Sequence, residues 1–291
     1  MRQMTHQPDR RSFIKLAGVA AAMAAGARMA AKPLGLPIGI QPYTVRNELA
    51  QDLAGTIEKL AAMGYEAIEV RDPFYGHTRE ELQSVLKKFG MPSPSAYYDH
   101  LADDDAWRKS IESATAFGAK YMVTPVPGDW TKSLDGWKRA ATRLNELGGL
   151  CRKAGITLLY HNHNFEFKVF EGKIAYDELL RLTDPELLKM EMDCFWTTFA
   201  GKDPVEYFTR YPGRFAILHI KDLKKGIEPS TDSPKGNPFT EVGTGVIDYR
   251  RIFKAAPTGG LKHYFMEQDR WDRPALESAR LSCEYLKKLD V

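Results

Sequence analysis

Histidine, carboxylate and lysine side chains gather at four places in this chain, each directly after a short apolar run. Residues 160–166 read Tyr-His-Asn-His-Asn-Phe-Glu, residues 191–193 Glu-Met-Asp, residues 219–222 His-Ile-Lys-Asp and residues 267–269 Glu-Gln-Asp. Two or three imidazoles with two carboxylates form a normal ligand set for manganese, iron, cobalt or zinc, whereas magnesium prefers more oxygen donors. Such groups can also move a proton next to a carbonyl.

Each of these residues also has a purely structural interpretation. A single histidine at a strand end usually forms only hydrogen bonds, and an aspartate there often caps the following helix. Lys221 could form an ordinary ion pair with Asp222 or Glu191. The chemical interpretation gains weight because four consecutive strands are expected to end in the same kind of group.

A repeated strand–turn–helix pattern is expected to position these groups. Strands are expected at 38–43, 67–70, 94–98, 120–124, 157–161, 187–192, 215–220 and 263–266. Helices are expected at 52–63, 78–88, 105–117, 134–154, 176–182, 204–211, 249–255 and 274–289. Eight strands that alternate with helices predict an α/β protein with a single (β/α)8 TIM barrel, in which the site lies at the carboxyl ends of the strands.

One connection of the predicted barrel is unusually long. It runs over residues 223–244 and is rich in Gly, Pro, Ser, Thr and Lys. A connection of this length is uncommon in a compact domain unless it has a function. We therefore expect a functional loop or lid between the seventh strand and the next helix.

Five segments of the chain resemble the sugar phosphate isomerase/epimerase superfamily, the barrel group related to xylose isomerase. They are residues 39–46, 160–167, 192–196, 218–222 and 267–269, and the resemblance covers roughly residues 36–290. It implies one divalent metal ion, with manganese favoured and cobalt, iron, zinc or magnesium as alternatives. The implied ligands are Asp193, His219 and Glu267, and the fourth is His161, with Glu166 as its alternative, because the strand-five glutamate of ketose epimerases is absent.

The resemblance also implies a reaction that begins with proton abstraction next to a carbonyl of a carbohydrate. Glu267 is expected to act as one acid–base group and His163 or Glu166 as the other, and Lys221 could hold a developing oxyanion. The residues expected to contact the substrate are Gln41, Tyr43, Glu69 and Trp196.

Three functions are compatible with such a site. Reprotonation would make the enzyme a sugar isomerase or epimerase, the commonest activity of the superfamily. Elimination of a β substituent would make it a lyase on 3-keto-glycosides, which the loss of one carboxylate base favours. The third is a non-catalytic carbohydrate-binding barrel, whose sugar-stacking rings would be Tyr43, Tyr97, Tyr98, Trp196 and Trp271.

The first 31 residues resemble a twin-arginine export signal. Arg10 and Arg11 precede Phe13 and Lys15, and a short apolar run with small residues comes next. This arrangement predicts a signal segment at 1–31, a barrel domain at 32–291, the twin-arginine export machinery as a partner, and a periplasmic or secreted enzyme. No later stretch is apolar enough to predict a membrane anchor.

Charge and cysteine usage narrow the partners further. The net charge is +3, and residues 1–31 carry five basic residues against one acidic residue, so residues 32–291 carry a net charge of −1. A near-neutral body does not favour nucleic acid as a partner. The three cysteines, Cys151, Cys194 and Cys283, lie far apart and are expected to be buried and free. The carbohydrate substrate is the expected small-molecule partner, and barrels of this group commonly form homodimers.

Overall fold

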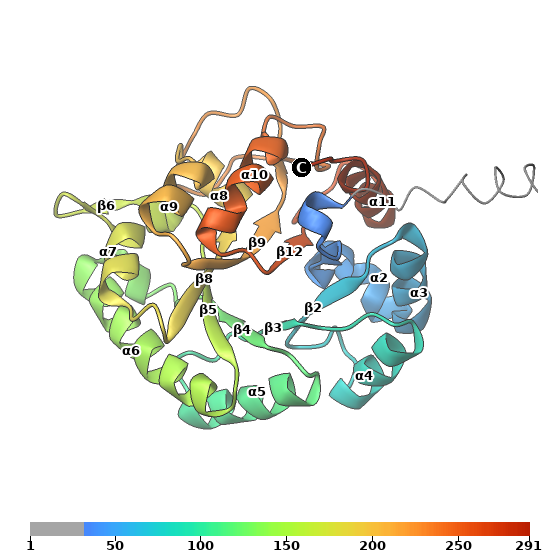
Figure 1. The fold of residues 1–291 in the computed structure, drawn as a ribbon, viewed down its shortest axis with the longest axis horizontal. Helices are drawn as coiled ribbons and strands as arrows, with labels where there is room; N and C mark the ends of the chain where they lie inside the picture. The colour runs from blue at the N-terminus through green and yellow to red at the C-terminus, as the bar shows by residue number, and fades with distance from the viewer. Residues whose placement is uncertain (1–31) are drawn as a thin grey trace, which may run out of the picture.

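Eight parallel strands close into a barrel in the computed structural model, which describes residues 32–291 (Figure 1). Around the barrel the strands run in the order β1, β12, β9, β8, β5, β4, β3, β2. They are β1 (Gly39–Ile40), β2 (Ala67–Arg71), β3 (Ser95–Tyr97), β4 (Tyr121–Thr124), β5 (Thr157–His161), β8 (Leu188–Asp193), β9 (Phe215–Ile220) and β12 (His263–Met266). The predicted (β/α)8 fold is therefore confirmed. The expected signal segment at 1–31 lies outside the described residues.

Helices form an outer ring around the strands in Figure 1. They are α2 (Arg46–Gln51), α3 (Leu53–Met63), α4 (Arg79–Lys88), α5 (Asp104–Ala116), α6 (Leu134–Lys153), α7 (Ala175–Leu182), α8 (Cys194–Phe199), α9 (Pro204–Arg210), α10 (Tyr249–Gly259) and α11 (Ala275–Leu286). Every predicted helix is present, with ends shifted by a few residues. The Thr78–Glu81 capping box forms at the start of α4, with reciprocal hydrogen bonds between side chains and backbone.

The structure differs from the sequence-based expectation at the first strand and in several short elements. β1 ends at Ile40, and Pro42 begins a 3-10 helix, Pro42–Val45, because proline has no N–H for a strand ladder. The helices α2 and α8 were not predicted. Two small antiparallel hairpins were also missed, β6 (Val169–Phe170) with β7 (Lys173–Ile174) and β10 (Asp222–Leu223) with β11 (Phe239–Thr240). Two-residue strands and one-turn helices carry too little periodicity to be recognised.

Closure of the barrel depends on the close approach of β1 to β12. Gly39 pairs with Phe265 in the parallel ladder. A Cβ atom at position 39 would lie 2.4 Å from the Phe265 ring and 2.6 Å from the Tyr264 carbonyl oxygen. Only glycine fits at this contact.

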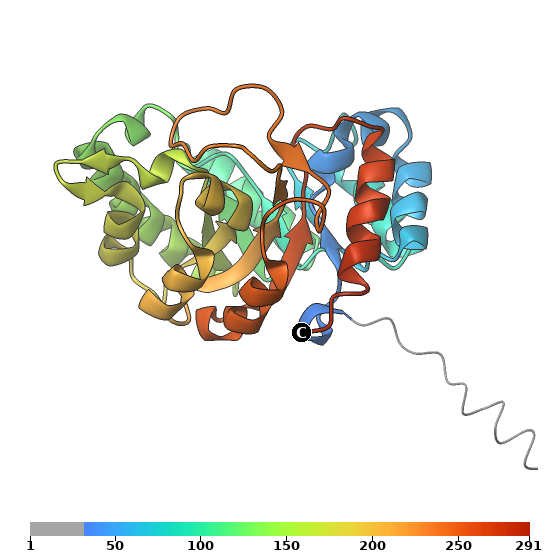
Figure 2. The ribbon, with the colours of Figure 1, turned by 90° about the horizontal axis from the view of Figure 1, so that it is seen from above.

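The long connection after β9 is held by polar contacts at several points. It arches over one edge of the barrel in Figure 2. The Asn164 side chain donates to the carbonyl oxygens of Ser230 and Asp232 at 3.1 and 2.7 Å, and the Ser230 N–H donates to the Phe199 carbonyl at 2.7 Å. The predicted lid function of this connection stays a prediction.

Two further expectations concern the described residues as a whole. Cys151, Cys194 and Cys283 are buried and free, as predicted. Within residues 32–291, no helix has both the length and the apolar character needed to cross a membrane.

Candidate active site

A cavity of about 430 Å³ opens at the carboxyl ends of the strands. This volume lies within the usual range for small-molecule sites. Residues of β2, β3, β5 and β9, or residues just after β1, β3, β4, β5, β9 and β12, contribute to its wall. The lining residues are Gln41, Tyr43, Arg71, Tyr97, Asp99, Pro125, Val126, Pro127, Gly128, His161, His163, Phe165, His219, Lys221, Glu267 and Asp269.

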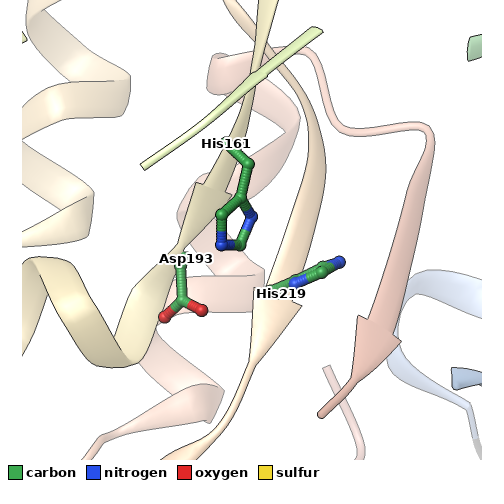
Figure 3. A group of neighbouring side chains, drawn as sticks. All are labelled: His161, Asp193 and His219. Carbon is green, nitrogen blue, oxygen red and sulfur yellow. The ribbon is translucent and has the colours of Figure 1, made fainter. Parts of the chain in front are cut away.

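Three predicted metal ligands converge from neighbouring strands. His161 ends β5, Asp193 ends β8, and His219 lies near the end of β9 (Figure 3). Each offers one ligand atom, and these atoms all lie within 4.8 Å of one another. All three residues are buried. The parallel register places His161 opposite Glu191, and Asp193 opposite His219, so neighbouring strands present their donors at almost the same height.

Hydrogen bonds with carboxylates orient both imidazole rings: Glu191 and Glu69 lie outside the cavity wall, and Glu267 lines the cavity. His161 Nδ1 lies 2.9 Å from Glu191 Oε1, which leaves Nε2 as the free ligand atom of this ring. His219 Nε2 lies 2.8 Å from Glu69 Oε2, and its Nδ1 lies 2.9 Å from Glu267 Oε2. A carboxylate partner on the second ring nitrogen is typical of metal-binding histidines, and His161 fits this arrangement. Both ring nitrogens of His219 face carboxylates, so Nδ1 would exchange its contact with Glu267 for the metal ion.

Burial and the surrounding charges perturb the acid–base behaviour of these groups. Burial, reinforced by the nearby His219, lowers the pKa of His161 well below its ordinary value, so this ring is neutral and available as a ligand. Burial raises the pKa of Asp193 to about 6, although Lys221 opposes this shift. Burial would lower the pKa of His219, but Glu191, Glu69 and Glu267 together raise it well above the ordinary value.

Lys221 lies at the centre of a cluster of three carboxylates. Its Nζ atom is 2.8 Å from Glu267 Oε2, 2.8 Å from Asp269 Oδ1 and 3.1 Å from Asp193 Oδ2. The side chain is only 2% exposed, so burial opposes its charge, but Asp193, Asp269 and Glu267 raise the pKa of Lys221 well above its ordinary value. The alternative partners named from the sequence, Asp222 and Glu191, do not form this ion pair. Asp222 instead accepts four backbone N–H groups, from Leu223, Gly243, Gly245 and Ile247.

The residues present fit a single divalent metal ion. His161, Asp193 and His219 supply mixed nitrogen and oxygen donors, and Glu267 lies beside His219 at the spacing of adjacent ligands. The local charge agrees, because three carboxylates, Asp193, Glu267 and Asp269, surround the single ammonium group of Lys221. An excess of carboxylates over ammonium groups favours a bound cation.

His163 and Glu166, the two other predicted acid–base groups, lie one behind the other. His163 lines the cavity, and burial lowers its pKa to about 3, so its ring is neutral. Glu166 is completely buried behind it, with Oε1 3.9 Å from His163 Nδ1 and 2.6 Å from the Tyr160 hydroxyl that donates to it. Burial raises the pKa of Glu166 to about 7. Glu166 belongs neither to the candidate metal ligands nor to the cavity wall. It lies behind His163 and contacts that ring instead of the cavity.

The four predicted substrate-binding residues divide into two pairs. Gln41 and Tyr43 line the cavity. Glu69 lies below it, where Oε2 accepts from Gln41 Nε2 at 2.7 Å and Oε1 accepts from the Ser95 hydroxyl at 2.5 Å. Trp196 packs against Phe195 and Phe239 and lies 5.8 Å from Lys221 Nζ, outside the cavity wall. In this structure, Glu69 and Trp196 support the residues that face the cavity.

Several cavity residues are absent from the predicted catalytic, metal-binding and substrate-binding sets, and Tyr97 was expected only as a sugar-stacking ring of a non-catalytic barrel. Asp269, Arg71, Tyr97 and Asp99 all line the cavity. The Glu-Gln-Asp run after β12 was a usable signal for Asp269, because Glu267 and Asp269, two residues apart, both face Lys221. Arg71 and Tyr97 are the last residues of β2 and β3. Their place at the carboxyl ends of strands was the signal that could have identified them.

Comparisons with known proteins agree with this fold. A family model for the xylose isomerase-like TIM barrel matches residues 57–289, and the chain belongs to that family. An inosose dehydratase from Clostridium perfringens is 26% identical over an alignment that covers 86% of this chain and 96% of the relative. The solved structure of a sugar phosphate isomerase/epimerase from Parabacteroides distasonis is 25% identical, with a TM-score of 0.76 and coverage of 90% and 98%. A probable 3-DHS dehydratase from Bacillus anthracis shares the fold at 16% identity, with a TM-score of 0.67 and coverage of 86% and 98%.

Proposed function

We propose that this member of the xylose isomerase-like TIM barrel family is a metal-dependent lyase. The enzyme would remove a proton from the carbon next to a carbonyl of a polyhydroxylated substrate and expel the β-hydroxyl group as water. The observation that carries the proposal is the position of Lys221, whose Nζ lies 2.8 Å from Glu267 Oε2 and 2.8 Å from Asp269 Oδ1 at the cavity wall. An ammonium donor and a carboxylate acceptor therefore lie side by side.

The proposed step begins at Asp269. This carboxylate lines the cavity, and burial raises its pKa even though Lys221 opposes the shift, which makes it a stronger base than an ordinary aspartate. Glu267 is less available, because its Oε2 atom already lies near His219 Nδ1 at 2.9 Å and Lys221 Nζ at 2.8 Å. Asp269 would take the proton from carbon, and the electrons of that C–H bond would form a carbon–carbon double bond.

Lys221 would complete the elimination. As the double bond forms, the bond between the β carbon and its hydroxyl oxygen breaks, and the Lys221 ammonium gives a proton to the departing oxygen, which leaves as water. The proton on Asp269 then passes across 2.8 Å to the Lys221 amine, which restores both groups. A divalent ion held by His161, Asp193, His219 and Glu267 would polarise the carbonyl oxygen and acidify the adjacent C–H bond.

The absence of a second cavity-facing carboxylate base on β5 also supports elimination. His161 stands at the end of this strand and is hydrogen-bonded to Glu191, and the neutral His163 is a weak base. Inversion at a carbon needs proton transfer on two opposite faces, whereas elimination can use one acid–base cluster. The similarity to an inosose dehydratase points to the same reaction class.

Isomerisation or epimerisation is the second candidate function. The 25% identity and TM-score of 0.76 to a sugar phosphate isomerase/epimerase favour it. Both candidates begin with proton abstraction, and they differ in whether the resulting carbanion is reprotonated or expels its β-hydroxyl group. The products therefore distinguish them.

The test is proton exchange and product analysis in D₂O with added Mn²⁺. The full-length protein would be incubated with a keto-inositol, a 3-keto-glucoside and a ketose, and monitored by proton NMR and ultraviolet absorbance. We expect metal-dependent loss of a carbon-bound proton and appearance of a conjugated enone, both abolished in Asp269→Asn. The matched control is Asp272→Asn, because Asp272 is an exposed aspartate of the same segment that pairs with Lys224.

Other outcomes would overturn the proposal. Proton exchange that yields an isomer without an enone would assign isomerisation. Metal binding without exchange or product on any substrate would favour a non-catalytic carbohydrate-binding barrel.

A further inference from the structure

Arg71 is the cavity-lining cation that has no carboxylate partner. It is the last residue of β2, on the wall opposite β8 and β9. Within residues 32–291, no carboxylate oxygen lies within the 4.0 Å ion-pair distance of its guanidinium group. Lys221, the other cavity-lining cation, pairs with three carboxylates. The charge of Arg71 is therefore available to an anionic ligand.

Two aromatic rings hold this guanidinium group. Its Cζ atom lies 4.3 Å from the Tyr97 ring centroid and 5.5 Å from the Tyr43 ring centroid. The Tyr97 hydroxyl group also forms a hydrogen bond with this guanidinium group. The ring faces cover the flat surface of the group, and its remaining N–H groups lie along the edge. The neighbouring Arg46, which also stacks on Tyr43, differs because its N–H groups donate to the backbone carbonyls of Tyr43 and Asp269.

The charge balance of the cavity indicates what Arg71 would bind. Lys221 is surrounded by the carboxylates of Asp193, Glu267 and Asp269, whereas no carboxylate lies within ion-pair distance of Arg71 in residues 32–291. The positive charge of Arg71 remains. Asp99 also lines the cavity, but it is exposed to solvent and lies beyond ion-pair distance, so it is a poor partner for Arg71.

We propose that Arg71 binds a carboxylate group of the substrate, which makes the substrate a polyhydroxylated keto acid. This inference rests on the proposed function, because the carbonyl end of the substrate must lie at the metal cluster. The planar fork of an arginine matches the two oxygens of a carboxylate. A phosphate is less suitable, because its second negative charge would find no further free cation along the described cavity wall.

Direct binding measurements with matched ligand pairs test this assignment. The pairs are D-glucuronate with D-glucose, and D-galacturonate with D-galactose, because the members of each pair differ only in a carboxylate or a hydroxymethyl group at C6. Binding to the Mn²⁺-loaded full-length protein would be measured by calorimetry. We expect the acid of at least one pair to bind about 10- to 100-fold more tightly than its neutral partner, the range for a hydrogen bond between charged groups.

Variants of Arg71 make the test specific. We expect Arg71→Met to abolish the preference for the acid and Arg71→Lys to keep part of it, because lysine retains the charge but loses the fork. The matched control is Arg139→Met, which removes an exposed arginine whose Cζ lies 5.8 Å from the Trp130 ring centroid outside the cavity wall. Circular dichroism would establish that each variant is folded.

Three results would overturn the assignment. They are equal binding of both members in both pairs, a preference that survives in Arg71→Met, and failure of both acids to bind at their solubility limit. Tighter binding of glucose 6-phosphate than of glucuronate would assign a phosphate instead of a carboxylate. Because binding is measured without turnover, acid selectivity can hold even where no proton exchange occurs, and the two proposals can fail separately.

Discussion

The two halves of the barrel mouth differ in how their charged groups are satisfied. On the half formed by β5, β8, β9 and β12, charged side chains neutralise one another, and the ion pair between Lys221 and Asp193 is almost completely buried. On the half formed by β1, β2 and β3, aromatic rings hold Arg71 without a carboxylate partner. The first arrangement suits proton transfer and metal binding, because burial and neighbouring charges shift the pKa values of its groups and ion pairs hold their side chains in place. The second suits recognition of an anionic ligand, because no carboxylate of residues 32–291 lies within ion-pair distance of Arg71.

The largest expected effect comes from substitution of Lys221, in the half where charged side chains neutralise one another. We expect Lys221→Met to reduce turnover by about 10²–10⁴-fold, the usual contribution of a general acid–base group. The Mn²⁺ affinity should not fall, because the variant loses a positive charge beside Asp193 and Glu267. Single-turnover kinetics and calorimetry would measure the two quantities. Lys224→Met is the control, since Lys224 pairs with the exposed Asp272. Turnover within a few-fold of wild type would refute the acid–base role.

Glu191→Gln tests a buried carboxylate of the same half. Glu191 Oε1 lies 2.9 Å from His161 Nδ1 and 3.1 Å from His219 Nε2, so it contacts two predicted ligands. We expect the Mn²⁺ dissociation constant to rise about 10- to 100-fold, which is typical for loss of such a partner. Tyr97→Phe, on the opposite half, should leave Mn²⁺ affinity unchanged. Equal affinity in Glu191→Gln and wild type would show that His161 is not a ligand or does not need this contact.

The raised pKa of Glu166 predicts that the stability difference between the wild-type protein and Glu166→Gln depends on pH. Its pKa in the folded protein is raised from 4.5 to about 7 by burial. The stability that comes from binding this proton is complete below pH 4.5 and is lost as the pH rises through about 7. Relative to Glu166→Gln, the wild-type protein should therefore lose stability across this window. Urea unfolding of both proteins on either side of the window measures the difference, and a pH-independent difference would contradict the raised pKa.

The smallest expected effect comes from the half assigned to recognition. Tyr97→Phe removes a hydroxyl group beside Arg71 and keeps the ring that holds the guanidinium. We expect KM to rise by about 2- to 10-fold, as for the loss of one hydrogen bond, with kcat unchanged. Steady-state kinetics on the substrate found in the exchange experiment would measure both constants. A fall in kcat with constant KM would place Tyr97 with the catalytic half.

The sequence predicts the barrel and much of the candidate site. Its eight strands and the convergence of His161, Asp193 and His219 are consequences of where strands end in a parallel barrel. The sequence does not predict the short first strand, the hairpins or the role of Arg71. A two-residue strand has no period to detect, and a charged residue that ends a strand looks the same in sequence whether or not a carboxylate neutralises it.

The local pattern of apolar residues, caps and glycines determined the order of strands and helices, because each element needs only neighbouring residues to specify it. Only the tertiary structure decided which charges are satisfied. His219 meets Glu69 across 150 positions of the chain, and Lys221 meets Asp193 and Asp269 from separate strands. Ion pairs and hydrogen bonds depend on distances of a few ångströms, and barrel closure sets those distances between residues that the sequence keeps far apart.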